Sequence, residues 1–445
     1  MDLAREDARR GDGEPPAAGG VASTQRPPAV AGRLLTTAAA AVVVLVAAVL
    51  RFWGAFDLNV RIGDEPFHVP SAINMSRYGV PLAMNWTHPP GGALILQGTI
   101  GLFGDDPVGW RIGGVLLGTF TVALLYAGAR RLTRSHTVSL LAAALLALDP
   151  FHVYFSRSTF MEVPVLCFFL LFLWSLQVYE EEEKGWALVL AGVALGLTAA
   201  TKSYFAVSAA LAIAWVVRAT WVRTEARAEL ILRLVCYLGL LPAAVYLGSF
   251  LQYFGDGHSL AEFVRMRADA FRTLRAVAPD AVDPWWLREG GGPWEWFVRP
   301  ISLGYRIDEP LRAPRYLLEL NNFPIRPIAL VALTYLAVRG VRERRARLLV
   351  PALLFASVYL LFLALSRPML SYSALVVLPF AYVALAWSVR LLERRHARLR
   401  GLSLAVLALT VLWGGYQYPL ATAKEVPGWL YGPILSGAAL TGLPR

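Results

Sequence analysis

The chain has 445 residues, of which 57% are hydrophobic and only 16% are charged, and its mean hydropathy is +0.51. A soluble globular protein carries about 25% charged residues, so this composition excludes an ordinary soluble domain. The net charge of +11 would suit a nucleic-acid binder, but the basic residues cluster beside hydrophobic segments. Membrane topology explains them better, and we expect a lipid bilayer and no nucleic acid among the partners.

Residues 1–33 are rich in Gly, Ala, Pro and charged side chains, and such a segment cannot bury enough apolar surface to fold. We therefore expect a disordered tail in the cytoplasm. The next run, Leu34–Leu50, contains no Asp, Glu, Lys or Arg. It is longer than the apolar part of a signal peptide and no clean cleavage site follows it, so it predicts a first transmembrane helix.

Long uncharged stretches recur along the rest of the chain, and a bilayer-spanning helix needs about 20 mostly apolar residues. The sequence therefore predicts an all-α polytopic membrane protein whose transmembrane domain occupies residues 34–423. About eleven transmembrane helices are expected, near residues 34–53, 108–129, 137–155, 163–180, 185–201, 203–219, 231–253, 324–340, 348–366, 370–390 and 401–419.

The Lys and Arg residues of the short loops predict the orientation in the membrane. Basic loops at 130–134, 218–233, 339–347 and 390–400 all fall on one side, and such loops stay in the cytoplasm. The N-terminus is then cytoplasmic, and residues 424–445 form a tail outside. We expect a multi-pass protein of the plasma membrane.

Two long segments fall on the outer side in this topology, and long loops are usually functional. The first, 56–107, contains an apolar portion at 91–104 that is too short to span and predicts a helix lying at the interface. The second, 254–322, contains arginines around apolar residues at 259–275, which predicts an amphipathic surface helix.

Ionisable residues other than those of the basic loops collect at the outer ends of the predicted helices, whereas a transporter usually keeps some near mid-membrane. Cations at a bilayer surface can bind a lipid phosphate, and a partly desolvated carboxylate can take a proton from a hydroxyl. The pattern predicts transfer of a group from a lipid-phosphate carrier to a hydroxyl acceptor. The residues in question are Asp64, Glu65, Arg111, Arg157, Glu162, Lys202 and Arg367.

Short motifs in a fixed order add a resemblance to this pattern. They are Asp64-Glu65, Thr87-His88-Pro89-Pro90, Leu102-Phe103-Gly104 ahead of Trp110-Arg111, Ser156-Arg157 with Glu162, Thr201-Lys202, and Trp294-Glu295-Trp296 with Arg299-Pro300. The series, which covers residues 34–390, resembles the GT-C glycosyltransferases of family 39, the protein O-mannosyltransferase-like type. These are phospholipid carrier-dependent enzymes.

The resemblance implies a GT-C fold and inverting transfer of a sugar from a polyprenyl-phosphate donor on the outer face of the membrane. The sugar would be mannose or a related hexose or pentose. The acceptor would be a hydroxyl of protein Ser or Thr, of a lipid or of a wall glycan. Glu162 stands where the family commonly has Asp, and the second outer segment is too short for the β-trefoil module of eukaryotic members.

We assign the general-base role to Asp64, with Glu65 as an orienting or acceptor-binding acid and Glu162 as a second catalytic acid. Six scattered histidines show no ligand spacing, so neither a metal nor a cofactor is expected. The candidates for binding the donor phosphate are Lys202, Arg111, Arg157 and Arg367, and those for substrate contact are His68, His88, Tyr372 and Trp294.

Alternatives remain for several of these residues. The acid pair Asp64-Glu65 could be a solvated loop, His88 could only start a helix before two prolines, and Lys202 could snorkel to the interface. The tryptophans at 285, 286, 294 and 296 also suit an interfacial aromatic belt. At the level of the whole chain, the alternative function is a transporter or flippase for a polyprenyl-linked substrate.

Overall fold

The structure is a computed structural model, and it describes residues 29–79, 86–276, 293–299, 301–307, 315–364, 371–436 and 440–442. Nearly all of the regular structure within these ranges is helical, which confirms the predicted fold class. One small sheet accompanies the helices and was not predicted. Of the tail expected at residues 1–33, residues 1–28 lie outside the described part of the chain. A helix begins at Ala29, within the range expected for the tail.

A helix lies at each of the predicted positions. Six described helices are long and apolar enough to cross a membrane, or seven if the bent pair α5 and α6 forms one span; the count of about eleven stays a prediction. The helices are α1 (Ala29–Phe52), α4 (Pro107–Thr133), α5 (His136–Ala147), α6 (Pro150–Ser156), α7 (Glu162–Glu182), α8 (Gly185–Thr201), α9 (Ala206–Trp221), α10 (Arg227–Leu234), η1 (Val235–Leu240), α11 (Leu241–Gly248), α15 (Ile325–Arg342), α16 (Ala346–Ala364), η3 (Ser371–Val376), α17 (Leu378–Arg395), η4 (Ala397–Leu399) and α18 (Leu402–Ala421).

Local sequence explains where several of these helices begin. Asp106 accepts hydrogen bonds from the backbone N–H groups of Val108 and Gly109 at the start of α4, and a proline follows the cap, which suits the first helical turn. Asp149 caps α6 in the same way, and α6 is bent by 62° from α5 at that point. The cap and the proline therefore break what the sequence presents as one apolar run.

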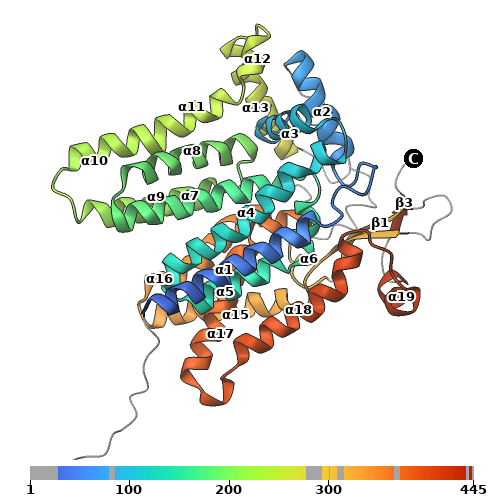
Figure 1. Ribbon diagram of the computed structural model, residues 1–445. Helices are drawn as coiled ribbons and strands as arrows, with labels where there is room; N and C mark the ends of the chain where they lie inside the picture. The colour runs from blue at the N-terminus through green and yellow to red at the C-terminus, as the bar shows by residue number, and fades with distance from the viewer. Residues whose placement is uncertain are drawn as a thin grey trace, which may run out of the picture.

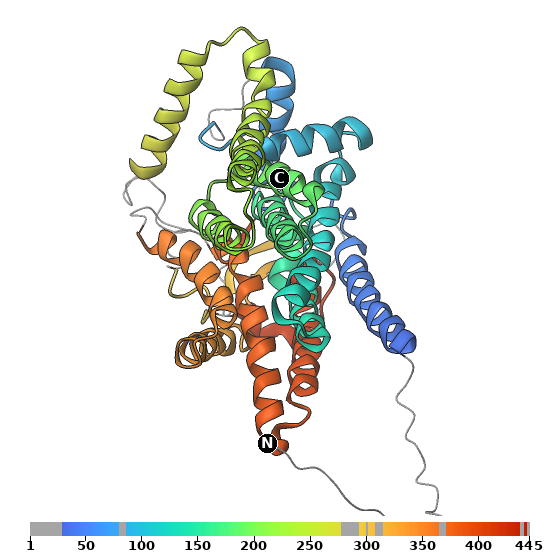
Figure 2. The same cartoon turned by 90° about the vertical axis from the view of Figure 1, so that its left-hand side faces the viewer.

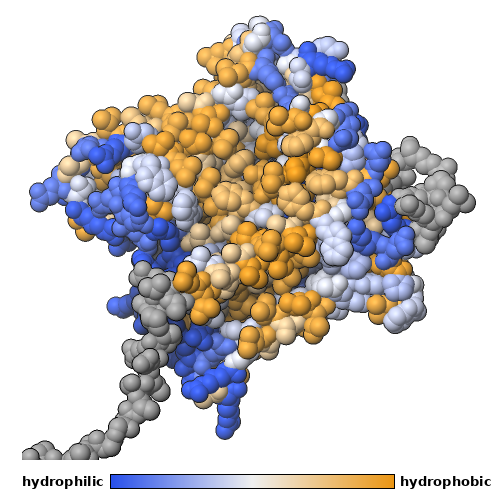
Figure 3. Space-filling view, in the orientation of Figure 1, coloured by the Kyte–Doolittle hydropathy of each residue, from blue (hydrophilic) through white to orange (hydrophobic). Residues whose placement is uncertain are grey.

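The long helices pack into one bundle, as Figures 1 and 2 show. Helix α7 lies inside it, with 72% of its apolar window buried, whereas α1 lies at the edge with 11% buried. Figure 3 shows a broad hydrophobic surface over the bundle, with hydrophilic residues gathered toward its ends. A surface of this kind suits contact with lipid rather than with water.

The two outer segments contribute shorter helices, which gather beside one end of α8 and α11 in Figure 1. The helices predicted at 91–104 and at 259–275 are both formed, as α3 and α13; their position at a membrane interface stays a prediction. Trp285, Trp286 and Arg367 lie outside the described residues. The elements are α2 (Glu65–Tyr78), α3 (Gly91–Phe103), α12 (Leu251–Gly255) and α13 (Leu260–Ala276).

The sheet joins the second outer segment to the C-terminus. Its strands are β1 (Ile301–Ile307), β2 (Arg315–Leu320) and β3 (Leu440–Gly442), in the order β2-β1-β3. Strand β1 pairs antiparallel with β2 and parallel with β3, and α19 (Gly428–Ser436) precedes β3. Strand β2 packs against α18 and α6, so the sheet brings residue 319 to the end of the bundle that holds the first outer segment.

Candidate active site

Asp64 occupies the N-cap position of α2, directly after the turn that ends the first connection from α1. Its side chain is 34% exposed, and its Oδ2 lies 3.8 Å from Nε2 of His68, one helical turn later. The two side chains share a face because residues four apart in a helix lie one above the other. This arrangement was expected from the spacing.

Burial changes the proton affinity of both groups. Desolvation, aided by the neighbouring carboxylate of Glu162 and opposed by Lys202, raises the pKa of Asp64 to about 7. Burial, aided by the charge of Lys202, lowers the pKa of His68 to about 3. His68 is therefore neutral at pH 7, and Asp64 titrates close to the pH at which a general base works best.

Glu162 and Lys202 form a buried ion pair beside Asp64. Glu162 is the first residue of α7 and Lys202 directly follows α8, and Lys202 Nζ donates to Glu162 Oε1. Tyr204 lies against both, with its hydroxyl 3.2 Å from Lys202 Nζ, and the ring of Tyr372 lies 5.4 Å from the same nitrogen. Lys202 is buried, so snorkelling to the interface does not account for its position.

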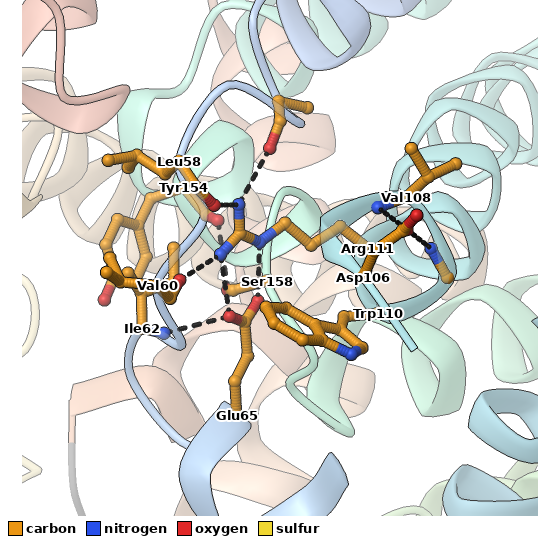
Figure 4. Close-up of polar contacts among 12 residues, drawn as sticks. Leu58, Val60, Ile62, Glu65, Asp106, Val108, Trp110, Arg111, Tyr154 and Ser158 are labelled. Atoms are coloured by element: carbon orange, nitrogen blue, oxygen red, sulfur yellow. Dashed lines mark hydrogen bonds and ion pairs between the residues drawn. The ribbon is translucent and has the colours of Figure 1, made fainter. Parts of the chain in front are cut away.

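Glu65 and Arg111 form a second buried pair, which Figure 4 shows with its surroundings. Arg111 Nε and Nη2 donate to the two oxygens of Glu65, each at 2.9 Å, and Ile62 N–H also donates to Glu65. The other N–H groups of Arg111 donate to the carbonyls of Ala55, Leu58 and Val60.

These contacts correct two expectations. All five N–H donors of Arg111 are used within the protein, so Arg111 does not fit the expected role of phosphate ligand. Glu65 is fully buried against it, which fits the orienting role among the two expected for this acid and not the acceptor-binding one. The pair instead holds residues 55–65 in place and thereby positions Asp64.

Arg157 also serves the structure in its described contacts. Its Nη1 donates to the carbonyl oxygens of Leu50 at 3.3 Å and Trp53 at 2.7 Å, at the end of α1. Carbonyls at the end of a helix have no partner within the helix, so Arg157 caps α1. We do not assign it to the donor phosphate.

The remaining candidates fall in different places. Tyr372 joins the Lys202 cluster. His88 lines a small pocket with Trp86, Tyr253 and Met266, apart from that cluster. Trp294 is 68% exposed, whereas Trp296 is buried in the core. Arg367, the fourth candidate for the phosphate, lies outside the described residues, and its assignment stays a prediction.

The sequence reasoning missed Glu319, Ser371 and Tyr204. Glu319 lies on β2 with 1% exposure, accepts a 3.1 Å hydrogen bond from Ser371 Oγ, and is close enough to Asp64 to interact with its charge. The sequence signal that could have identified Glu319 is its position as a single acid in the apolar run 316–320. An acid in such a run is expected to be buried, and a carboxylate is rarely buried unless it is paired or has a function.

The described part of the chain holds no group of three or more His, Cys, Asp or Glu side chains arranged for a metal ion. Cys167 and Cys236 are both free thiols. The residues around Asp64 offer a carboxylate base beside the buried ammonium of Lys202, with the hydroxyl of Tyr204 next to it.

Comparison with known proteins agrees with this geometry. Residues 87–247 match the family model described as dolichyl-phosphate-mannose-protein mannosyltransferase. This range contains Glu162 and Lys202 but not Asp64. A polyprenol-phosphate-mannose–protein mannosyltransferase of Mycobacterium tuberculosis is 28% identical over 57% of this chain and 59% of its own length. The protein of the same description from Corynebacterium glutamicum is 24% identical over 76% of this chain and 80% of its own.

The chain thus spans about 59% of the length of the first of these relatives. Among solved structures, the protein O-mannosyltransferase Pmt1-Pmt2 complex of S. cerevisiae matches with a TM-score of 0.78 and 12% identity, over 92% of this chain and 93% of that one. The archaeal oligosaccharyltransferase AglB of Archaeoglobus fulgidus matches with a TM-score of 0.54 and 13% identity, over 91% of this chain and 58% of its own. At such identities the likeness shows the fold alone. The chain therefore has the fold of these membrane glycosyltransferases, and in its matched sequence it is similar to the protein O-mannosyltransferases.

Proposed function

We propose that this chain is a membrane glycosyltransferase that moves mannose from a polyprenyl-phosphate donor to a hydroxyl of a protein acceptor. The transfer is inverting and takes place on the outer face of the plasma membrane. The observation that carries the proposal is the meeting of Asp64 with the buried Glu162–Lys202 pair. The relatives are polyprenol-phosphate-mannose–protein mannosyltransferases, so mannose and protein are the first sugar and acceptor to test.

Each residue has a role that follows from its contacts. The acceptor oxygen attacks the anomeric carbon while its proton passes to Asp64. The bond between that carbon and the phosphate oxygen breaks, and its electron pair stays on the phosphate. Lys202 stabilises the negative charge that develops there, an electrostatic contribution that is often the largest in catalysis.

Glu162 has a supporting role. It stands at the N-terminus of α7, where the helix dipole favours a carboxylate, and it keeps Lys202 protonated and in place. Glu65 and Arg111 fix the segment that presents Asp64. Tyr204 and Tyr372 surround the ammonium and exclude water from it.

The test is transfer of labelled mannose from a polyprenyl-phosphate donor to an acceptor peptide by the purified chain in vesicles. Asp64→Asn keeps the shape but cannot accept the proton, so we expect a loss of about a hundredfold or more in kcat. Asp57→Asn is the matched control, since Asp57 lies in the same segment and its contact is an exposed pair with Lys424.

Undiminished transfer by Asp64→Asn would remove Asp64 from the role of base. If wild type transfers no label with any of several polyprenyl-phosphate sugars, the proposed activity is wrong. Movement of the labelled lipid between the two leaflets in the same vesicles would then favour the transporter.

A further inference from the structure

Glu319 is a buried carboxylate to which the proposed mechanism gives no role. It lies on β2, four residues beyond the start of the strand, and only 1% of its surface is exposed. Ser371 donates a hydrogen bond to its Oε2 at 3.1 Å. Within the described residues, Glu319 forms no ion pair with Lys, Arg or His. A carboxylate buried in this way is costly when charged, unless a cation compensates for it.

The proton affinity of Glu319 follows from these surroundings. Burial, opposed by the hydrogen bond from Ser371 and aided by the charge of Asp64, raises the pKa of Glu319 to about 8. Asp64 loses its proton more readily, because its side chain is 34% exposed and faces Lys202, whereas Glu319 is 1% exposed and has no cation among the described residues. A pH range therefore exists in which Asp64 is ionised while Glu319 still holds its proton.

Few charged side chains among the described residues surround Asp64 and Glu319. Lys202 is the cation that faces Asp64, and Glu162 already pairs with it. Arg111 is used by Glu65, and His68 is neutral. An ionised Glu319 would therefore add a third carboxylate beside one ammonium.

The described ionisable groups on α6 and α18, the two helices that pack against β2, are engaged elsewhere. On α6 and at its ends, His152 contacts Arg51, Asp149 pairs with Arg326, and Arg157 binds carbonyls of α1. On α18, the hydroxyl of Tyr418 donates to the carbonyl of Leu50. None of these described groups supplies a cation to Glu319.

We propose that Glu319 is a positioning residue of this site, which keeps its proton while Asp64 is ionised and so lets the site accept a phosphate anion. The proposal rests on the proposed function, since it concerns the phosphate of the same sugar donor. Ionisation of Glu319 places a negative charge near that phosphate in an interior where charges interact strongly. Loss of this proton therefore weakens donor binding and leaves Asp64 able to act as a base.

The experiment measures KM for the polyprenyl-phosphate mannose donor, and kcat, between about pH 5 and pH 9 for wild type, Glu319→Gln and Glu319→Ala. In wild type we expect KM to rise by about tenfold for each pH unit above the pKa of Glu319. Glu319→Gln cannot ionise and can still accept the hydrogen bond of Ser371, so its KM stays flat above pH 8. Glu425→Gln, an exposed carboxylate after α18, is the matched control and follows wild type.

A merely structural role would not produce this difference between wild type and Glu319→Gln in how KM depends on pH. It would lower kcat or the yield of folded protein in both Glu319 variants without changing how KM depends on pH. An alkaline rise of KM in Glu319→Gln equal to that of wild type overturns the proposal. The acid limb of kcat, which reports Asp64, is expected to stay in place in Glu319→Gln.

A second measurement does not depend on sugar transfer. The infrared carbonyl band of a protonated carboxylic acid is recorded at pH 7 and at about pH 9 for wild type, Glu319→Gln and Glu425→Gln. We expect a band at pH 7, to which Asp64 also contributes, that fades at higher pH in wild type and in Glu425→Gln and that is smaller in Glu319→Gln, which lacks the contribution of Glu319. An unchanged band in Glu319→Gln overturns the proposal. If wild type transfers no mannose, the proposed function fails, while this band and equilibrium binding of the donor against pH still decide the role of Glu319.

Discussion

Two adjacent acids, Asp64 and Glu65, have opposite environments. Asp64 is the N-cap of α2 and Glu65 is its first helical residue, and neighbouring residues of a helix do not share a face. Glu65 therefore turns to Arg111 and is fully buried, while Asp64 stays 34% exposed next to Glu162 and Lys202. One acid is neutralised by a partner for structure, and the other is left available for chemistry.

Removing Arg111 from the buried Glu65–Arg111 pair tests whether this pair has a structural role. Arg111→Met leaves the charge of Glu65 buried without its partner, which lowers the free energy of unfolding by about 3–5 kcal/mol. Thermal unfolding in detergent measures the change. Glu65→Gln combined with Arg111→Met should recover part of the stability, because no charge is then left unpaired. Arg233→Met, which breaks the exposed pair with Glu229, is the control and should leave the melting temperature unchanged.

The packing of α7 and α8 explains how Glu162 and Lys202, which are 40 positions apart in the sequence, form an ion pair. α7 has 21 residues and α8 has 17, and at about 1.5 Å per residue the two are similar in length. They pack closely and are joined by a short connection, so the chain returns Lys202 to the end of α7 that carries Glu162. The phosphate site thus depends on one antiparallel helix pair.

A change at Lys202 tests this pair in function. Lys202→Gln removes the ammonium that the phosphate meets and leaves Glu162 without its cation. We expect KM for the polyprenyl-phosphate donor to rise by about tenfold to a hundredfold, as for loss of a hydrogen bond to a charged group. Lys184→Gln, at an exposed lysine before α8, should bind the donor as wild type does. A normal KM in Lys202→Gln would contradict phosphate binding at this residue.

At the scale of the whole molecule, the site joins segments from the first outer segment, from the α7–α8 pair and from the sheet near the C-terminus. The hydrophobic surface of the bundle in Figure 3 leaves hydrophilic groups toward its ends. The distribution of Lys and Arg among the short loops predicts which of these ends faces the cytoplasm.

Labelling of single cysteines tests that orientation. In a background without Cys167 and Cys236, Trp429→Cys on α19 and Val222→Cys after α9 are both well exposed, since each native side chain is 82% exposed. A membrane-impermeant maleimide added to intact cells should label the first and should label the second only after permeabilisation. The reverse result would place Asp64 and Lys202 on the cytoplasmic side.

The sequence by itself determined the class of the molecule and much of its local structure. Uncharged runs predicted the helices because lipid contact requires apolar side chains along a whole helix. The interval between Asp64 and His68 predicted a shared face because helical periodicity is local. Short motifs in order were enough to suggest the family, since each of them can be read without knowing its neighbours in space.

Only the tertiary structure decided which charges are free for chemistry. Arg111 and Lys202 look alike in the sequence, as cations at outer helix ends, yet Arg111 is saturated by Glu65 and backbone carbonyls while Lys202 meets Glu162 near Asp64. Glu319 could not be placed at all, because it reaches Asp64 through a sheet that pairs residues far apart in the chain. Pairing and burial depend on contacts between distant segments, and these contacts set the proton affinities on which the proposed chemistry relies.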